Sequence, residues 1–550
     1  MKNKNRRDFI KLSSIITIGS PYLLKSNLLR ARGLKSSGSN FENDKVIIIG
    51  AGIAGLTTAY ELEKMGITNI TIIEAKDRVG GRTLNVPVEG GYVAEGGGQW
   101  IGPGQTAIFG LLEELDIGTF KSYAIGDNAN GDSLSNADLQ DRDRVIALLE
   151  ELANEITLEE PWNAPMAEEW DSIILDDWLS DNHQTIGGYF ELFFGTIAFL
   201  GNPTNISLLY FLFYVKSGGG VLSLLEGAQE SRISGGSQML SLQLASKLSA
   251  EILLSTPVIS IGEVNGTIAV QTENDTLNCE RVVVAMMPKD ANKINFITGL
   301  TEERQQLQEG WIASAGMKIS IVFTAPFWRE DGLNGGAYGN QLFFIADNSP
   351  EDASSGILVA FPTEQFEIAE NREAIAVEEL ASIFGPKIYD YIDYTETNWD
   401  LDPYTGGCVS PLPVGFFSQY GAALREPVGN IHWAGTETSE IWNGYMDGAV
   451  RSGQRVAKEL VEVLNIASNV SREVVVIKIY PNPTEELLTI KAELNLNSIT
   501  MLDAQGKFIN VFQTIDKKTQ VINVSSYPIG IYYLEVYVNG AYQRLKWVKN

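Results

Sequence analysis

A buried-strand pattern that runs into a glycine-rich turn constrains this chain more than any other feature. Val46 to Ile49 is a continuous apolar run of β-branched side chains, the pattern of a strand buried on both faces. It leads into Gly50-Ala51-Gly52-Ile53-Ala54-Gly55 and then into a helical stretch from Leu56 to Met65. A second apolar strand, Ile70 to Ile73, ends at Glu74, nineteen residues after Gly55. The order strand, turn, helix, strand predicts an α/β unit with a parallel sheet.

Each part of this pattern has a mechanical role in holding a dinucleotide. Gly50 permits the tight turn, and Gly52 lets the backbone approach a pyrophosphate. Gly55 lets the helix pack closely on the strand, and Glu74 can accept hydrogen bonds from ribose hydroxyls. The helix N-terminus adds unpaired amides and the positive end of its dipole. The spacing therefore predicts a Rossmann-like α/β domain with GxGxxG at its first turn.

Charge and residue counts exclude several other kinds of site. The 550 residues carry 41 Lys and Arg against 69 Asp and Glu, a formal net charge of −28. Because a phosphate-backbone binder needs a basic face, we expect no nucleic-acid partner. Two Cys and two His are too few for a disulfide framework or a multi-thiolate zinc site, so no metal is expected. The chemistry is therefore expected to be carried by a cofactor.

Two further glycine-rich runs point to the identity of that cofactor. Arg78-Val79-Gly80-Gly81-Arg82-Thr83 follows Glu74, and Glu95-Gly96-Gly97-Gly98-Gln99-Trp100-Ile101-Gly102 comes later. Both runs resemble the flavin-containing amine oxidase family, in which they wrap FAD. The resemblance implies that Arg82 reaches the pyrophosphate and that Gly97, Gly98, Gln99 and Trp100 pass beside the flavin ring. An NAD dehydrogenase is not expected to carry this second element, so the expected cofactor is FAD.

The stretch from position 402 to position 449 extends the resemblance. Its matching runs are Asp402–Cys408, Ile431–Thr438 and Trp442–Ala449, and they closely resemble the monoamine oxidases. The resemblance implies that Thr436, Glu437 and Met446 also contact FAD. An intervening piece from Arg232 to Gln238, followed by Pro257-Val258, fits as well, and implies that Val258 lies near the adenine end.

The resemblance runs in register over residues 44–464 and implies a discontinuous domain. The FAD part is expected at about 44–120, 225–300 and 400–464. An α+β substrate part is expected at about 121–224 and 301–399, inserted between these segments.

Two reactive side chains have both a functional and a structural interpretation. Lys318 lies in the strand-like run Gly316 to Ile321, where a lysine is usually a solvated edge residue. The resemblance instead matches it to the family lysine that holds a water against flavin N5. Cys408 matches the cysteine that mammalian monoamine oxidases bond to the flavin 8α carbon, so FAD is covalently attached through Cys408 in one interpretation. In the other interpretation Cys408 is a buried, inert thiol.

Tyr445 matches one wall of the aromatic cage that flanks the amine in this family. The other wall would follow Cys408, where this chain has Val409 and Ser410. Because two facing rings would guide and polarise the amine better than one, this departure leaves the choice of amine open.

The two ends of the chain differ in composition from its acidic middle. Residues 1–40 hold nine Lys and Arg but one acid, with Arg6-Arg7 ahead of a short apolar run that ends at Leu24. This leader resembles a twin-arginine export signal; the alternative is a disordered basic tail. After a linker at 465–473, residues 474–550 show short alternating strands at Val474–Tyr480, Leu487–Ile490 and Ser498–Leu502.

These strands predict a small all-β sandwich. Tyr480-Pro481-Asn482-Pro483 and the terminal Lys546-Trp547-Val548-Lys549 resemble the C-terminal sorting domain of type IX secretion. The resemblance implies recognition by the type IX export machinery. The alternative is a carbohydrate-binding or spacer sandwich.

Together these features predict an exported FAD-dependent amine oxidase. By resemblance to the family, hydride passes from the amine α-carbon to flavin N5, the imine hydrolyses to an aldehyde, and O₂ is reduced to H₂O₂. Lys318 and Tyr445 are the expected catalytic residues. The expected route passes through the periplasm and ends outside the cell or at its surface. Which amine is oxidised and the oligomeric state stay open.

Three alternatives remain from the sequence. An L-amino-acid oxidase would be expected to carry a carboxylate-binding arginine near Gly98 to Ile101, where this chain has none. The second alternative is a flavin-binding surface protein without turnover, against which Lys318, Tyr445 and Cys408 argue. The third is a membrane-engaged flavin desaturase, against which the lack of a basic amphipathic helix after the leader argues.

Overall fold

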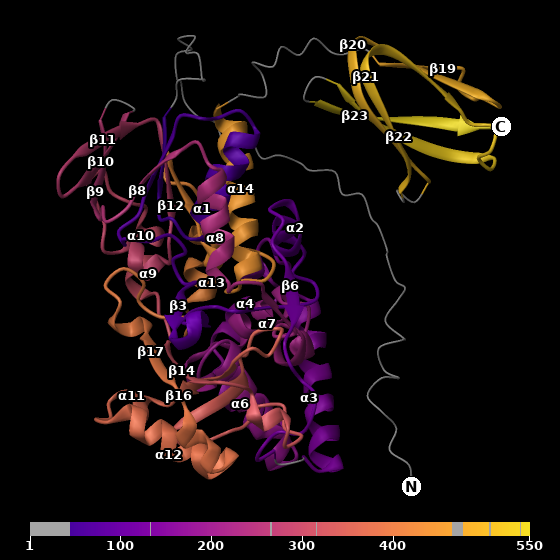
Figure 1. The fold of residues 1–550 in the computed structure, drawn as a ribbon. Helices are drawn as coiled ribbons and strands as arrows, with labels where there is room; N and C mark the ends of the chain where they lie inside the picture. Colours follow the sequence, from indigo (N-terminus) through magenta and orange to yellow (C-terminus); the bar gives the residue numbers. More distant parts are fainter. Residues whose placement is uncertain are drawn as a thin grey trace. The chain divides into compact units, whose positions relative to one another are not determined.

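The computed structural model describes residues 45–131, 134–264, 267–314, 316–464, 477–504, 508–538 and 541–550. The predicted export signal at 1–40 and the predicted linker at 465–473 lie outside these residues. Figure 1 shows the helices and strands of the two described parts, 45–464 and 477–550.

A five-stranded parallel sheet organises the nucleotide-binding end. Its strand order is β18 (Ile431–Ala434), β12 (Arg281–Ala285), β1 (Val46–Ile49), β2 (Ile70–Ile73) and β8 (Glu251–Leu253). Each neighbouring pair is parallel. The middle strand is β1, and none of its side chains is more than 4% exposed. The prediction of a first strand buried on both faces is confirmed.

The two faces of this sheet are covered by different layers. Helices α1 (Ile53–Lys64), α2 (Thr106–Glu114), α8 (Gln238–Lys247) and α14 (Met446–Leu464) share one hydrophobic core with Val46 and Ile48. Figure 1 shows α1, α8 and α14 side by side. Ile47 and Ile49 point to the opposite face, because successive side chains of a strand alternate. They pack on a second sheet ordered β11 (Thr276–Cys279), β10 (Thr267–Thr272), β9 (Val258–Val264) and β13 (Asn295–Phe296).

The turn between β1 and α1 accepts only glycine at two positions. Gly50 has φ +107°, in the region that L side chains rarely adopt. A Cβ atom on Gly55 would lie 2.0 Å from the carbonyl oxygen of Gly50, which is shorter than any non-bonded contact. The first turn of α1 is thereby held directly against the end of β1.

A four-stranded antiparallel sheet belongs to the segments between 301 and 399. Its order is β15 (Leu342–Asp347), β16 (Gly356–Pro362), β14 (Met317–Phe323) and β17 (Asp393–Asn398). Helices α11 (Glu364–Glu367) and α12 (Arg372–Phe384) pack on it. Because β14 lies between two neighbours and all its residues are buried, the interpretation of Lys318 as a solvated edge residue is wrong.

Helices form the rest of the middle of the chain. They are α3 (Asn136–Asn154), α4 (Ala167–Asp171), α5 (Leu175–Asn182), α6 (Ile186–Phe199) and α7 (Leu208–Ser217). Helix α7 is the core of this group, with nine of its ten residues buried. Shorter helices α9 (Pro288–Ala291), α10 (Glu302–Gly310) and α13 (Phe417–Tyr420) follow. Among the described residues, no helix combines the length and apolar character that a membrane span requires.

Short strands connect these parts near the predicted flavin loop. They are β3 (Asn85–Val88), β4 (Tyr92–Glu95), β5 (Trp100–Ile101), β6 (Thr119–Lys121) and β7 (Ser231–Ile233). β3 pairs with β4, and β7 pairs with both β5 and β6.

The C-terminal part is all-β, as predicted. Its strands are β19 (Lys478–Tyr480), β20 (Leu487–Leu502), β21 (Phe508–Asn523), β22 (Gly530–Val538) and β23 (Ala541–Lys549). The prediction of separate strands at 487–490 and 498–502 is wrong, since both belong to β20. Its pairing with β21 shifts register between Lys491 and Leu496, and this irregularity broke the alternating pattern in the sequence.

The close contact at Gly55 predicts that the effect of a glycine-to-alanine substitution on stability depends strongly on the position of the glycine. Gly55→Ala should destabilise the protein by about 1–3 kcal/mol or more, because its Cβ overlaps the Gly50 carbonyl. Gly110 is also helical, but a Cβ there meets nothing within 4 Å. Gly110→Ala should therefore stabilise the protein by about 0.5–1 kcal/mol. Thermal unfolding of both variants checks this, and equal shifts in Tm would contradict it.

Candidate active site

The predicted dinucleotide loop surrounds the N-terminus of α1. Glu74 accepts a hydrogen bond from the backbone amide of Ala51 at 2.7 Å, which links the end of β2 to the glycine-rich turn. Gly52 forms an isolated bridge with Gly80, so the two glycine-rich loops lie side by side. A Cβ on Gly52 would meet only the Cα of Gly81, at 3.8 Å. No side chain therefore lies within 4 Å of this position at the helix N-terminus.

The predicted adenine end lies beside the same carboxylate residue. The backbone amide of Thr256 donates to the carbonyl of Glu74 at 2.8 Å. Val258, at the start of β9, packs on the core that contains Ile73. The structure thus brings the segment from Thr256 to Val258 next to Glu74, at the end of β2.

Arg82 connects three segments that are far apart in the sequence. Its Nη1 lies 2.6 Å from Glu437 Oε1 and donates to the backbone carbonyl of Cys408 at 2.9 Å. Glu437 is 3% exposed, and its second oxygen, Oε2, has no partner within the described part of the chain. Because a buried charge is costly unless it is paired, this ion pair locks the Arg82 loop to the loop after β18.

Lys318 reaches from β14 into the loop that the sequence places beside the flavin ring. Its Nζ donates to the backbone carbonyls of Glu95 at 3.0 Å and Gly97 at 2.6 Å, and to Oε1 of Gln99. The rings of Trp100 and Phe361 lie with their centroids 5.8 Å and 5.3 Å from this nitrogen. Burial lowers the pKa of Lys318 to about 7, although nearby Glu95 acts to raise it.

Tyr445 lies at the start of α14 among other aromatic side chains. Its ring centroid is 5.0 Å from that of Trp442 and 6.1 Å from that of Tyr214. Thr436 Oγ1 donates to the backbone carbonyl of Tyr445 at 2.7 Å, which ties this residue to the loop after β18. Burial raises the pKa of the Tyr445 hydroxyl, so it stays protonated at neutral pH.

Met446, the first residue of α14, faces the loop from Glu95 to Trp100. This loop is predicted to lie beside the flavin ring and is called the flavin-ring loop below. A Cβ built on Gly98 would lie 3.9 Å from Met446 Cγ. Gly98 itself is exposed, whereas its neighbours Gly97 and Gln99 are buried. The loop from 95 to 100 is thus placed between α14 on one side and Lys318 on the other.

Cys408 is accessible to solvent although protein surrounds it. Its side chain belongs to an exposed residue, yet burial raises the pKa of its thiol, with Arg82 and Lys318 acting to lower it. The next residues are held elsewhere: Val409 donates its backbone amide to Ser314 Oγ at 3.4 Å, and Ser410 Oγ accepts from Trp311 Nε1 at 2.8 Å.

Sequence reasoning missed three residues that complete this region. Phe361 flanks Lys318, Trp399 donates its Nε1 to the carbonyl of Gly96 at 2.9 Å, and Asn348 accepts from Gln99 at 3.1 Å. Each lies outside the glycine-rich motifs, in or after a strand of the antiparallel sheet or in the short turn after β17. No local pattern marks such residues, because only the packing of that sheet on the flavin loop brings them near.

The residues present fit FAD on three structural grounds. The first turn of α1 has neither an acidic residue nor a capping side chain, so it suits a pyrophosphate. The space over Gly52 and Gly81 admits a group that a side chain there would displace. Glu437 Oε2 is buried without a partner among the described residues, which leaves a polar atom for a ligand.

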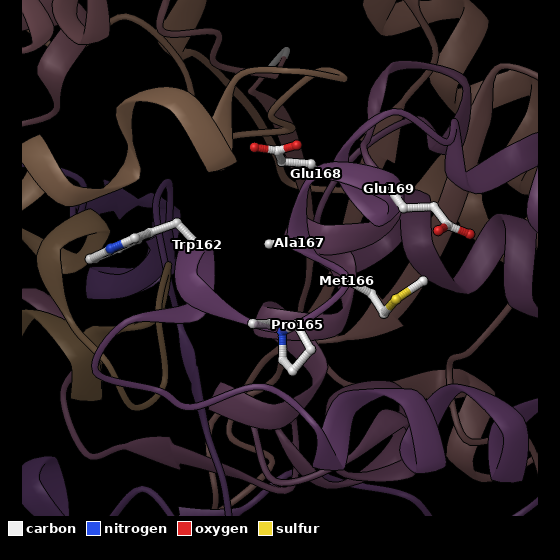
Figure 2. A pocket seen from close by; sticks show the side chains of 7 residues that line it. Trp162, Pro165, Met166, Ala167, Glu168 and Glu169 are labelled. Atoms are coloured by element: carbon white, nitrogen blue, oxygen red, sulfur yellow. The ribbon is translucent and has the colours of Figure 1, made fainter.

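A hollow on another part of the molecule contains none of these residues. Trp162 and the segment from Ala164 to Glu169 line it, at the start of α4 (Figure 2). Within the ranges that the structure describes, no group of three or more His, Cys, Asp or Glu side chains could hold a metal ion.

Comparison with known families decides the identity of the fold. Residues 53–461 match the flavin containing amine oxidoreductase family. This chain belongs to that family. FAD is its cofactor, and it is an enzyme of amine oxidation. Residues 478–550 match the secretion system C-terminal sorting domain.

Individual relatives cover most of the amine oxidoreductase part. The putative flavin-containing monoamine oxidase AofH of Mycobacterium tuberculosis is 35% identical over 76% of this chain and 97% of its own length. Flavin-containing amine oxidase A of Sus scrofa is 31% identical over 83% of this chain and 92% of its own.

Solved structures show the same similarity. Putrescine oxidase bound to putrescine has a TM-score of 0.72 at 30% identity, over 76% of this chain and 99% of its own. Cyclohexylamine oxidase from Brevibacterium oxydans has a TM-score of 0.72 at 30% identity, over 77% of this chain and 99% of its own.

The lowered pKa of Lys318 predicts a pH-dependent contribution to stability. Between pH 7 and its ordinary pKa of 10.5, the unfolded chain binds a proton that the folded chain has released. The free energy of unfolding should therefore rise with pH in this window, by at most about 1.4 kcal/mol per pH unit. Replacing Lys318 with Met removes this gain.

Urea unfolding of the FAD-loaded wild type and Lys318→Met at pH 7, 8 and 9 measures the difference. The wild type should gain stability relative to the variant at each step. Lys458→Met, which removes an exposed lysine of α14, controls for the loss of one positive charge. Parallel curves for wild type and Lys318→Met would contradict the lowered pKa.

Proposed function

We propose that this enzyme oxidises a neutral, largely apolar amine, with Lys318 and Tyr445 facing the reacting centre and O₂ as the final acceptor. The observation that carries the proposal is the burial of Lys318 against the carbonyls of Glu95 and Gly97, between the rings of Trp100 and Phe361. The relatives named for monoamines, putrescine and cyclohexylamine support an amine substrate.

Several residues would hold FAD in this proposal. The N-terminus of α1 with Gly50, Gly52 and Gly55 would take the pyrophosphate, together with Arg82. Glu74 would take the ribose, and Val258 the adenine. The loop of Gly97, Gly98, Gln99 and Trp100 would line the ring with Cys408, Thr436, Glu437 and Met446. When bound, FAD supplies the hydride acceptor for the amine α-carbon and then passes two electrons to O₂, giving H₂O₂.

The chain's own residues keep the amine neutral and dry. Trp100, Phe361, Trp442 and Tyr445 would present apolar surface that excludes water, and this loss of hydration would disfavour the charged ammonium form of a substrate. Tyr445 contributes a protonated hydroxyl beside them. The imine product then hydrolyses to an aldehyde outside this apolar region.

The paired arginines favour an amine over an amino acid. Arg82 is held by Glu437, and Arg232 lies 2.7 Å from the buried carboxylate of Glu95. A substrate carboxylate that bound to Arg82 or Arg232 would compete with one of these buried acids. We therefore rank the L-amino-acid oxidase behind the amine oxidase.

We also propose that the amine oxidoreductase region is divided into the two parts expected from the sequence, and that the protein is exported. The FAD part comprises about 44–120, 225–300 and 400–464, and the substrate part about 121–224 and 301–399. The sorting domain supports export, and the Arg6-Arg7 leader supports a twin-arginine route through the periplasm to the exterior or the cell surface.

Reduction of the bound flavin by amines tests the proposed activity. Under argon, an apolar amine should bleach the visible flavin absorbance, whereas amino acids should leave it unchanged, and air should restore it with release of H₂O₂. Lys318→Met should slow turnover about a hundredfold or more, the range for one group acting on proton transfer. Bleaching by amino acids alone would move the assignment to the carboxylate-binding class.

Attachment of the flavin to Cys408 is tested without turnover. A thioether would replace the thiol S–H bond and one C–H bond of the flavin 8α methyl group, and the two electrons released would pass through the flavin to O₂. Acid precipitation should then leave the yellow colour with the protein, and Cys408→Ala should release it. Cys279→Ala, which changes a buried thiol elsewhere, is the control. Colour in the supernatant of the wild type would refute attachment.

A further inference from the structure

Gln99 holds both ends of its amide in a buried chain of hydrogen bonds. Its Oε1 accepts from Lys318 Nζ, and its Nε2 donates to Asn348 Oδ1 at 3.1 Å. Gln99 is 2% exposed and Asn348 is 0% exposed. Three residues from three separate segments therefore form one line, Lys318 to Gln99 to Asn348, that is largely buried from solvent.

The chemistry of Lys318 sets the direction of this chain. A protonated lysine has only donors, so Gln99 must turn its carbonyl oxygen toward it. The Gln99 NH₂ group then faces Asn348, which must present its own oxygen. This order leaves Asn348 Nδ2 buried without a partner among the described residues. The unsatisfied Asn348 donor is a consequence of the orientation that keeps the Gln99 oxygen hydrogen-bonded to Lys318.

Asn348 is a rigid anchor for this arrangement. Its backbone amide donates to the carbonyl of Ile357 at 2.7 Å, across the end of the antiparallel sheet. The preceding residue, Asp347, is bound by Trp328 Nε1 at 2.8 Å and by Arg329 Nε at 2.7 Å. The backbone of Asn348 is therefore held in place.

Gln99 is the side-chain acceptor of Lys318 within the described structure, since its other two acceptors are main-chain carbonyls. The charged and titratable groups that act on Lys318 are Glu95, Arg232 and Cys408. Glu95 and Arg232 are paired with each other, and Glu95 also accepts from the backbone amide of Ser237. The orientation of the lysine therefore depends on Gln99 more than on any nearby charge.

We propose that Gln99, anchored by Asn348, is a positioning residue that directs the Lys318 amine and sets the pH at which it changes protonation. This inference rests on the proposed function, in which Lys318 faces the reacting centre. It assigns Gln99 a role toward the lysine in addition to its place beside the flavin ring, and it assigns Asn348 a role for the first time.

Three variants separate this role from simple packing. Gln99→Glu places a carboxylate against Lys318 and should raise the protonation midpoint by about 1–3 pH units, the effect of an adjacent opposite charge. Gln99→Leu removes an acceptor of the charged form and should lower it. Asn348→Ala releases the Gln99 amide and should lower it by less than Gln99→Leu does. Gln308→Leu, which changes a buried glutamine on α10, is the control.

Two readouts measure the protonation midpoint of Lys318 without an amine substrate. The visible spectrum of the oxidised, FAD-loaded enzyme is titrated from pH 5 to pH 10. The protein is then reduced with dithionite, and its reoxidation by O₂ is followed by stopped flow over the same range. Opposite shifts for Gln99→Glu and Gln99→Leu, with Gln308→Leu at the wild-type midpoint, support the proposal.

One midpoint shared by the wild type and both Gln99 variants would overturn the proposal, provided each variant retains FAD. If neither Gln99 variant retains FAD, the protonation midpoint of Asn348→Ala is compared with that of the wild type. An unshifted midpoint in Asn348→Ala would then overturn the proposal. Because dithionite replaces the amine, failure of amines to bleach the flavin would count against the proposed function alone.

Discussion

The parallel pairing of β1 with β2 on one side and β12 on the other is the constraint on which the rest of the structure depends. The four residues of β1 are buried on both faces, so their backbone polar groups must pair with neighbouring strands. Parallel strands need long crossover connections. The chain therefore leaves this sheet after β2 and again after β12, and each excursion builds part of the surroundings of the flavin-ring loop before β18 closes the sheet.

Arg82 and Arg232 have a different kind of partner from Lys318, and this difference has a chemical consequence. Arg82 and Arg232 are each locked to a buried carboxylate, because an unpaired buried charge would destabilise the fold. Lys318 instead meets two carbonyls and an amide oxygen. Dipoles compensate for lost hydration less fully than a full opposite charge does, so the lysine pKa falls to about 7. The lysine is thus able to change protonation near neutral pH while Arg82 and Arg232 keep fixed partners.

The sequence predicted those parts that short-range rules control. The strand, turn, helix and strand around Gly50 to Glu74 follow from side-chain size and backbone freedom, and all form as predicted. The functional interpretation of Lys318 stays a prediction, whereas its edge interpretation failed because strand neighbours cannot be inferred from one strand. The break inside β20 was misread for a related reason: a register shift resembles a turn when only one strand is seen.

What the sequence determined by itself is the kind of chemistry: a glycine-lined helix N-terminus, an acid at the end of the next strand, and a lysine in an apolar strand with few histidines or cysteines elsewhere. What only the tertiary structure decided is which side chains meet. Gln99 and Asn348 are 249 positions apart, and Arg82 and Cys408 are 326 apart. Such contacts depend on how two separately built sheets pack, and packing is set by the sum of many small apolar contacts that no single motif encodes.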